Sequence, residues 1–103
     1  MRAARPAIGF LLIAGACSTA GSDAPRPARH VVEMTGMAFH PADLTVQRGD
    51  TVVWINRDLV PHTGFGTGPL AQGDSGTYVP RERGEVPYIC ELHPTMKGKL
   101  LVR

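Results

Sequence analysis

The chain has 103 residues, of which 43% are hydrophobic, 19% charged and 6% aromatic, and this length suffices for one modest domain. Its two cysteines exclude a disulfide-dense miniprotein, and its four histidines exclude a row of metal fingers. The net charge is only +2, with eleven Lys and Arg against nine Asp and Glu, and the basic residues are scattered along the chain, which argues against a nucleic-acid partner. Twelve Gly and nine Pro disfavour long helices and suit short strands joined by tight turns.

Residues 1–16 have the build of an export signal. Arg2 and Arg5 form a basic start, residues 7–16 form a ten-residue apolar stretch, and small residues follow. Ten apolar residues are too few to span a bilayer, which needs about 20. The segment therefore predicts export of the chain rather than a membrane-spanning helix.

Cys17 follows this signal in a setting that resembles a bacterial lipobox. In such a motif, here the run Ile-Ala-Gly-Ala-Cys at residues 13–17, cleavage leaves the cysteine as a new N-terminus that carries lipid. Ordinary cleavage after Ala16 would instead leave Cys17 as a free thiol on a flexible tail. We expect lipidation, because an unpaired exposed cysteine is a liability in an oxidising compartment.

The next segment, residues 17–29, is predicted to be a flexible tether. Its residues after the cysteine are small, polar and proline-bearing, with no apolar period. The folded domain then spans residues 30–103, which is 74 residues. A domain of this size has a thin core, so a bound ion would add stability that it needs.

The apolar residues of this domain alternate with polar ones, which is the pattern of strands rather than helices. Residues 51–55 form a β-branched and aromatic run that is typical of a central strand. Turn-forming residues separate the other predicted strands, which are residues 30–34, 44–46, 77–80, 86–90 and 99–102. Strands at intervals of about ten residues predict an antiparallel β-sandwich.

Three candidate metal ligands stand three residues apart near the end of the chain: Cys90, His93 and Met96. A thiolate, an imidazole and a thioether are soft and borderline ligands. A second imidazole, His62, lies 28 residues before Cys90, at the end of another strand, where neighbouring strands bring the two loops together. A trigonal His₂Cys site with a weak axial Met is the blue-copper arrangement, so the ligand set predicts copper over zinc.

Three segments closely resemble cupredoxins of the plastocyanin and amicyanin kind: residues 49–58, 60–63 and 90–100. The most specific part is Cys-x-x-His-x-x-Met followed by Lys-Gly and an apolar strand, which matches the short ligand loop of amicyanin. The resemblance implies an all-β fold, a small Greek-key β-sandwich of about seven strands. It also implies one copper ion that alternates between Cu(I) and Cu(II). By the same likeness, the equatorial ligands would be His62, Cys90 and His93, and the axial ligand would be Met96.

Three residues beside these ligands are expected to tune the site: Asn56, Thr63 and Leu92. Relatives commonly carry Asn where this chain has Thr63, which keeps the backbone N–H that reaches the cysteine sulfur and offers a hydroxyl as a shorter tie between the loops. Relatives commonly carry Pro where this chain has Leu92, which keeps an N–H that can donate to the sulfur of Cys90. We expect this extra bond to lower the reduction potential.

These features predict a small exported blue-copper protein that shuttles single electrons between redox partners and is not an enzyme. By resemblance, the far ring nitrogen of His93 would reach the surface within a docking patch of Leu92, Pro94 and Phe65. Such a patch suits a small and transient protein contact. We expect a monomer in the periplasm or at the outer face of the cell membrane. Its membrane contact is expected only through lipid on Cys17, and no nucleic acid is expected.

Two other functions remain open at this stage. A copper storage or delivery protein would use the same ligands but exchange the metal quickly. A thiol enzyme would use Cys90 and His93 as nucleophile and base, but it would leave Met96 without a role. A Cys-His₂ zinc site is a lesser alternative.

The remaining polar groups are interpreted as structural. His30 and His40 have no further metal-ligating residues around them and are expected at the surface. The charged run at residues 81–83 is interpreted as a solvated turn.

Overall fold

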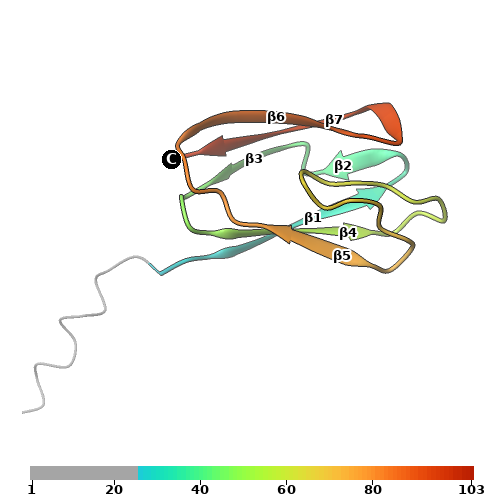
Figure 1. Ribbon diagram of the computed structural model, residues 1–103, viewed down its shortest axis with the longest axis horizontal. Helices are drawn as coiled ribbons and strands as arrows, with labels where there is room; N and C mark the ends of the chain where they lie inside the picture. Colours follow the sequence, from blue (N-terminus) through green and yellow to red (C-terminus); the bar gives the residue numbers. More distant parts are fainter. Residues whose placement is uncertain (1–25) are drawn as a thin grey trace, which may run out of the picture.

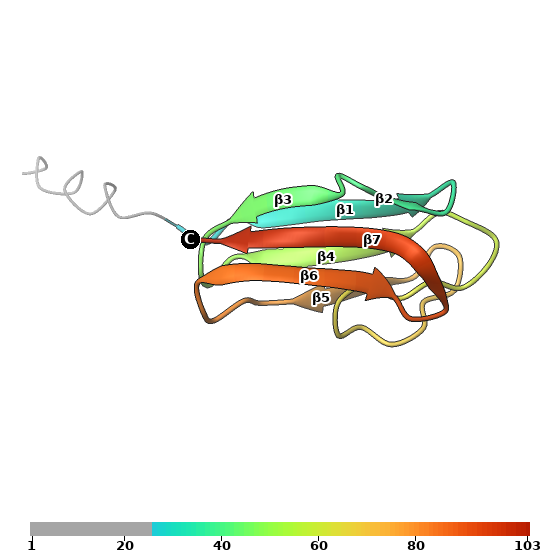
Figure 2. The ribbon, with the colours of Figure 1, turned by 90° about the horizontal axis from the view of Figure 1, so that it is seen from above.

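A computed structural model describes residues 26–103, so the predicted export signal, Cys17 and the first part of the tether lie outside the described residues. Seven strands form the two layers of a β-sandwich (Figures 1 and 2). In chain order they are β1 (Arg29–Thr35), β2 (Ala38–His40), β3 (Asp43–Val46), β4 (Thr51–Asn56), β5 (Ser75–Tyr78), β6 (Gly84–Cys90) and β7 (His93–Val102). None of the described residues belongs to a helix long and apolar enough to cross a membrane.

The two sheets have the strand orders β2-β1-β4-β5 and β3-β7-β6. Adjacent strands pair antiparallel in β1–β2, β4–β5 and β6–β7, but β4 runs parallel to β1 and β7 runs parallel to β3. The all-β sandwich is confirmed, whereas the expectation of antiparallel pairing throughout is not met. The reason is that the chain leaves the first sheet to form β3 and returns as β4 in the direction of β1.

Each predicted strand overlaps a strand of the structure, although β5 begins and ends two residues before the predicted range 77–80. Two further differences are larger. Strand β2 was not predicted, because it has only three residues and follows the tight turn at Gly36 and Met37, where φ is positive. Strand β7 begins at His93 rather than at residue 99, since the hairpin pairing with β6 continues as far as Cys90. A proline and a glycine within β7 hide this longer strand from the sequence pattern.

Trp54 of β4 and Tyr88 of β6 join the two sheets in the core. The indole Nε1–H of Trp54 donates to the hydroxyl of Tyr88 at 3.1 Å, and the two rings pack edge to face with centroids 5.5 Å apart. Gly64 lies against the indole and Gly98 lies against the phenol ring, so a Cβ at either glycine would collide with the ring. The loop after β4 and the strand β7 therefore both pack closely against these two core rings.

The strands run between two different ends of the sandwich (Figures 1 and 2). At one end, here called the entry end, the described chain begins and β7 finishes. At the opposite end, here called the hairpin end, lie the β6–β7 turn and much of the loop that joins β4 to β5. The predicted metal ligands lie at the hairpin end.

Candidate metal centre

Three of the predicted ligands meet at the hairpin end: His62, Cys90 and His93. The Nδ1 atoms of the two histidines are 3.2 Å apart, and each lies 3.8 Å from Sγ of Cys90. A point equidistant from these three atoms is about 2.1 Å from each, which is close to ordinary metal–nitrogen and metal–sulfur distances. The three side chains fit one metal ion without moving.

The His62 ring is held in one orientation by Asp58. Nε2 of His62 lies 2.8 Å from Oδ2 of Asp58, whose two oxygens also accept the backbone N–H groups of Gly36 and Met37. Because a carboxylate only accepts, Nε2 carries the proton and Nδ1 turns its lone pair toward Cys90. The N–H of Met37 and the imidazole of His62 are the largest causes that lower the pKa of Asp58, so this carboxylate stays charged.

Asn56 at the end of β4 shapes the loop that carries His62. Its side-chain Nδ2 donates to the carbonyls of Val60, at 2.8 Å, and Leu70, at 2.9 Å, while its Oδ1 accepts the N–H of Asp58 at 2.8 Å. His62 and Leu70 also exchange two backbone hydrogen bonds, of 3.1 and 2.8 Å. Hydrogen bonds therefore hold both the segment that carries His62 and the segment around Leu70, and His62 is fully buried.

Cys90 and His93 are paired across the end of the β6–β7 hairpin. Only Glu91 and Leu92 separate them, so the second and third ligands lie on facing strands. The predicted strands 86–90 and 99–102 would leave His93 in the loop between them, but it is the first residue of β7. This pairing fixes the distance between the two ligands through the backbone ladder.

A bulge in β7 brings Met96 into the interior. The ladder pairs Ile89 with Lys97 but pairs the next residue, Cys90, with His93, so three residues of β7 have no partner on β6. Met96, the last of the three, is buried within the core cluster. Its sulfur as the axial ligand stays a prediction.

Thr63 connects the two ligand loops. Its backbone N–H lies 3.3 Å from Sγ of Cys90, and its hydroxyl accepts the N–H of Glu91 at 2.8 Å. The residue after the first histidine thus contacts both the sulfur and the turn that follows it, as the sequence predicted for a threonine at this position.

The surroundings of Cys90 favour the thiolate. Burial raises the pKa of this thiol, but four hydrogen-bonding groups lower it by more than burial raises it, so that the pKa falls from 9.0 to about 6. These groups are the N–H of Thr63, the ring of His93, the N–H of Leu92 and the ring of His62. The thiolate is the form that binds metals. The polar groups around the sulfur therefore suit a metal ligand better than an inert core cysteine.

Sequence comparison identifies relatives with the same kind of site. No protein-family model matches the chain. Amicyanin of Paracoccus denitrificans is 35% identical over 83 residues, which cover 70% of this chain and 63% of that protein, slightly under two thirds of its length. Amicyanin-alpha of Methylorubrum extorquens is 32% identical over 82 residues, which cover 69% of each chain. The chain belongs to the amicyanin family of cupredoxins.

Solved structures agree with this membership. The crystal structure of amicyanin from Paracoccus versutus matches with a TM-score of 0.67 and 28% identity, over 82% of this chain and 89% of that one. A copper-containing nitrite reductase from Thermus scotoductus matches with a TM-score of 0.67 and 30% identity, over 78% of this chain but only 23% of the enzyme. The His₂Cys set of this amicyanin-like domain fits a single copper ion.

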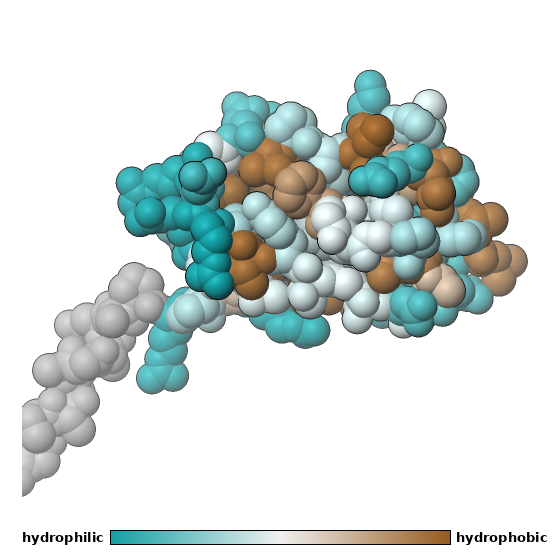
Figure 3. All heavy atoms as spheres, viewed as in Figure 1, coloured by the Kyte–Doolittle hydropathy of each residue, from teal (hydrophilic) through white to brown (hydrophobic). Residues whose placement is uncertain are grey.

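Several apolar side chains are exposed at the hairpin end, beside hydrophilic ones (Figure 3). Leu92 of the predicted docking patch is 46% exposed, but Phe65 packs edge to face against Tyr78 and is half-buried. Leu59, at 84% exposure, and Val60 were not predicted as part of this surface. The sequence does contain a signal for this surface, because Leu59 and Val60 are two adjacent apolar residues in a loop that is otherwise rich in turn-forming residues.

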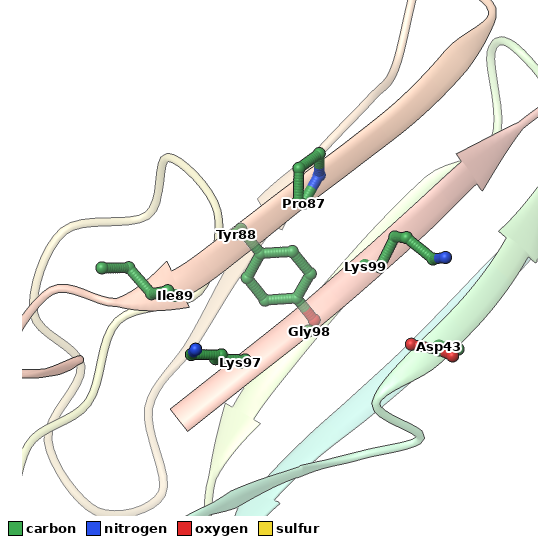
Figure 4. Close-up of a pocket in the computed structure, with 7 residues that line it drawn as sticks. All are labelled: Asp43, Pro87, Tyr88, Ile89, Lys97, Gly98 and Lys99. Carbon is green, nitrogen blue, oxygen red and sulfur yellow. The ribbon is translucent and has the colours of Figure 1, made fainter. Parts of the chain in front are cut away.

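A shallow hollow on the outer face of β6 and β7 is separate from the metal centre (Figure 4). It contains none of the candidate ligands, and its lining residues are Asp43, Pro87, Tyr88, Ile89, Lys97, Gly98 and Lys99. Lys99 is paired with Glu85 of β6 at 3.5 Å. This face carries both positive and negative side chains, and among the described residues it holds no cluster of metal-ligating groups.

The two remaining histidines lie outside the site. His40 is exposed and its Nε2 lies 3.1 Å from the carbonyl of Thr35. His30 is half-buried and its Nε2 lies 2.9 Å from Oδ2 of Asp50, so it is a structural partner of that carboxylate rather than a free surface residue.

Proposed function

We propose that this protein is an exported one-electron carrier that binds a single copper ion through His62, Cys90 and His93, with Met96 as a weak axial ligand. The observation that carries the proposal is the triangle of two imidazole nitrogens and one sulfur, which is assembled at bonding distance from a common centre. Copper supplies the Cu(I)/Cu(II) couple, and one-electron transfer is fastest where the ligands need not rearrange.

The chain's own residues supply that rigidity. Asp58 orients the ring of His62, and Thr63 holds the sulfur of Cys90 through its N–H. The β6–β7 ladder fixes His93 opposite Cys90. Each ligand therefore has a support from a different element, and the set keeps its geometry through a change of charge.

The apolar hairpin end suits a transient redox partner. Leu92 and Pro94 are exposed beside His93, whose ring is only half-buried, and Leu59 and Val60 add apolar surface from the neighbouring loop. A small dry contact there would bring a partner's redox centre close to the ring of His93. We propose a monomeric carrier that meets its donor and acceptor at this end, rather than an enzyme with a substrate cleft.

Export and anchoring are part of the proposal. The basic and apolar start of the chain supports removal of residues 1–16, and the lipobox-like run supports lipid on Cys17. The copper domain would then stand in the periplasm or at the outer face of the cell membrane, on the tether of residues 17–29.

The burial of Cys90 and His62 supports neither a thiol enzyme nor a copper delivery protein. A thiol enzyme needs a nucleophile that its substrate can reach, but Cys90 is fully buried. A copper delivery protein needs ligands that release the metal readily, but His62 is also fully buried, its ring is held by Asp58, and its backbone is hydrogen-bonded to Leu70. A slow loss of Cu(I) to a competing chelator would separate the carrier from the delivery protein.

The test is the visible spectrum of the chain from residue 17 onward after addition of copper. We expect an intense blue colour that a mild reductant bleaches. Cys90→Ser should lose this colour, whereas the matched control Cys17→Ser should keep it. A folded protein that binds copper without colour, or a blue Cys90→Ser variant, would overturn the proposal.

A further inference from the structure

The entry end, opposite the metal centre, carries a cluster of exposed arginines that we call the arginine pole. Two neighbouring surface hollows share Arg48, and one of them is lined mainly by arginines. Figure 3 shows a large group of hydrophilic residues at this end. Five members of the pole line these hollows, and the sixth, Arg29, begins β1 at the same end; the five are Arg26, Arg48, Arg81, Arg83 and Arg103.

Backbone hydrogen bonds hold these separate segments together. The N–H of Arg48 donates to the carbonyl of Arg103 at 2.9 Å, and the N–H of Gly49 donates to the carbonyl of Pro80, just before Arg81, at 2.9 Å. The N–H of Thr51 donates to the carbonyl of Ala28 at 2.9 Å. The arginines therefore belong to turns and strand ends that backbone hydrogen bonds connect to one another.

The charge of the pole is not neutralised within the described part of the chain. Among residues 26–103, no carboxylate lies within 4.0 Å of any of the six guanidinium groups. Asp50 is buried at this end and is engaged by the N–H groups of Ala28 and Gln47 and by His30. Glu82 is the exposed carboxylate in the midst of the pole. The pole thus presents a net positive surface.

The pole is positive because basic residues are gathered at one end of the domain, not because the chain has a high net charge. Beyond residue 16 the chain has nine basic and nine acidic residues, so it is formally neutral. Six of the nine basic residues nevertheless lie in the pole. A neutral protein with one strongly basic end is attracted to an extended anionic surface only in one orientation.

The path of the chain indicates which anionic surface this is. The described chain enters the fold within the pole, at Arg26, and Cys17 stands nine residues earlier. Nine residues reach at most about 30 Å, so lipid on Cys17 would keep the pole close to a bilayer. Strand β6 leads from Arg83 to Cys90, a length of about 20 Å, so the metal centre would point away from that bilayer.

We propose that the arginine pole binds the surface of a bilayer containing anionic phospholipids, through their phosphate groups. Guanidinium groups pair with phosphates in two-pronged hydrogen bonds, and several of them spread over turns suit a surface of many headgroups. A basic patch beside a lipid anchor adds electrostatic attraction to anionic headgroups. The hairpin end is then free to meet soluble redox partners.

The test uses the chain from residue 17 onward with Cys17→Ser, so that no attached lipid contributes. Its sedimentation with phosphatidylcholine vesicles containing about one third phosphatidylglycerol is compared with that on phosphatidylcholine alone. We expect binding to the anionic vesicles only, with loss of binding as the salt concentration rises. No binding to the anionic vesicles at low salt would overturn the proposal, and so would equal binding to both. Retention on the polyanion heparin without vesicle binding would also overturn it.

Two triple variants of equal charge locate the surface. Arg48→Gln, Arg81→Gln and Arg83→Gln together should weaken vesicle binding by about fivefold for each arginine, or about 100-fold in all. Arg57→Gln, Lys97→Gln and Lys99→Gln remove the same charge outside the pole and should change binding far less. An equal loss in both triples would show that net charge alone acts, which contradicts a dedicated pole. All six side chains are exposed or half-buried, so thermal unfolding followed by circular dichroism should be unchanged. The vesicle assay needs no copper, so its failure is distinct from failure of the proposed electron transfer.

Discussion

The carboxylate of Asp58 lies 2.8 Å from Nε2 of His62, and the two N–H groups of the β1–β2 turn hold that carboxylate in place. This contact connects the first sheet to a candidate copper ligand. A carboxylate behind a ligating imidazole fixes its tautomer and raises its basicity. The loop residue Asp58 is therefore a positioning residue for His62.

Replacement of Asp58 by Asn should weaken copper binding by about 10- to 100-fold. The variant keeps the size of the side chain but removes the negative charge behind His62, so the imidazole becomes a poorer donor to Cu(II). The reduction potential should rise for the same reason. Competition with a chelator of known affinity and a redox titration measure the two effects. Asp74→Asn, in the same loop but exposed, is the control, and an Asp58→Asn variant that behaves like it would contradict this role.

Leu92 should lower the reduction potential through its backbone N–H, which helps to lower the pKa of the Cys90 thiol. Proline has no N–H, so Leu92→Pro should raise the potential. A bond worth about 1 kcal/mol to the oxidised state corresponds to about 40 mV for one electron. Leu92→Ala keeps the N–H and should leave the potential nearly unchanged. The interpretation fails if Leu92→Pro leaves the potential unchanged or lowers it.

The clustering of His62, Cys90 and His93 was predictable from the sequence, and Met96 stays a predicted ligand. Cys90, His93 and Met96 stand at fixed short spacings, and alternation of apolar residues predicted the strand before Cys90. The orientation of His62 was not predictable, since it depends on Asp58 and on amides of a turn more than twenty residues earlier in the chain. Only the fold brings that turn to the ligand loop.

Two other features were hidden for similar reasons. Strand spacing does not specify which strands become neighbours, so the parallel pairings of β1 with β4 and β3 with β7 did not follow from it. The arginines are scattered in sequence, and the run at residues 81–83 is, by itself, no more than a solvated turn. The pole exists because the ends of β1, β3, β5 and β7 meet at one end of the sandwich.

Asp50 should make the stability of the fold sensitive to acid. The N–H of Ala28 is the largest cause that lowers its pKa, followed by His30 and the N–H of Gln47, and the pKa falls to about 2. Because the folded pKa lies below the unfolded value near 4, the charged carboxylate stabilises the fold above about pH 4. This contribution is lost as the pH falls from about 4 to about 2.

The Asp50→Asn variant tests this dependence by urea unfolding at several pH values. It should be less stable than the parent chain at pH 7, and the difference should shrink as the pH falls through that range. Asp43→Asn changes an exposed carboxylate at the start of β3, and its stability should equal that of the parent chain at every pH. A constant difference between Asp50→Asn and the parent would contradict a role for ionisation.

Met96 should tune the copper site from the bulge in β7, and Met96→Leu tests this with little change of volume. Such a swap in a core usually costs less than about 1.5 kcal/mol, so the variant should fold. It should still turn blue with copper, because the two imidazoles and the thiolate remain, but its reduction potential should rise since Cu(II) loses a weak donor. Met34→Leu makes the same swap at another fully buried methionine, so it should leave the potential unchanged. Equal potentials in the two variants would show that the sulfur of Met96 is packing material in the core rather than a ligand.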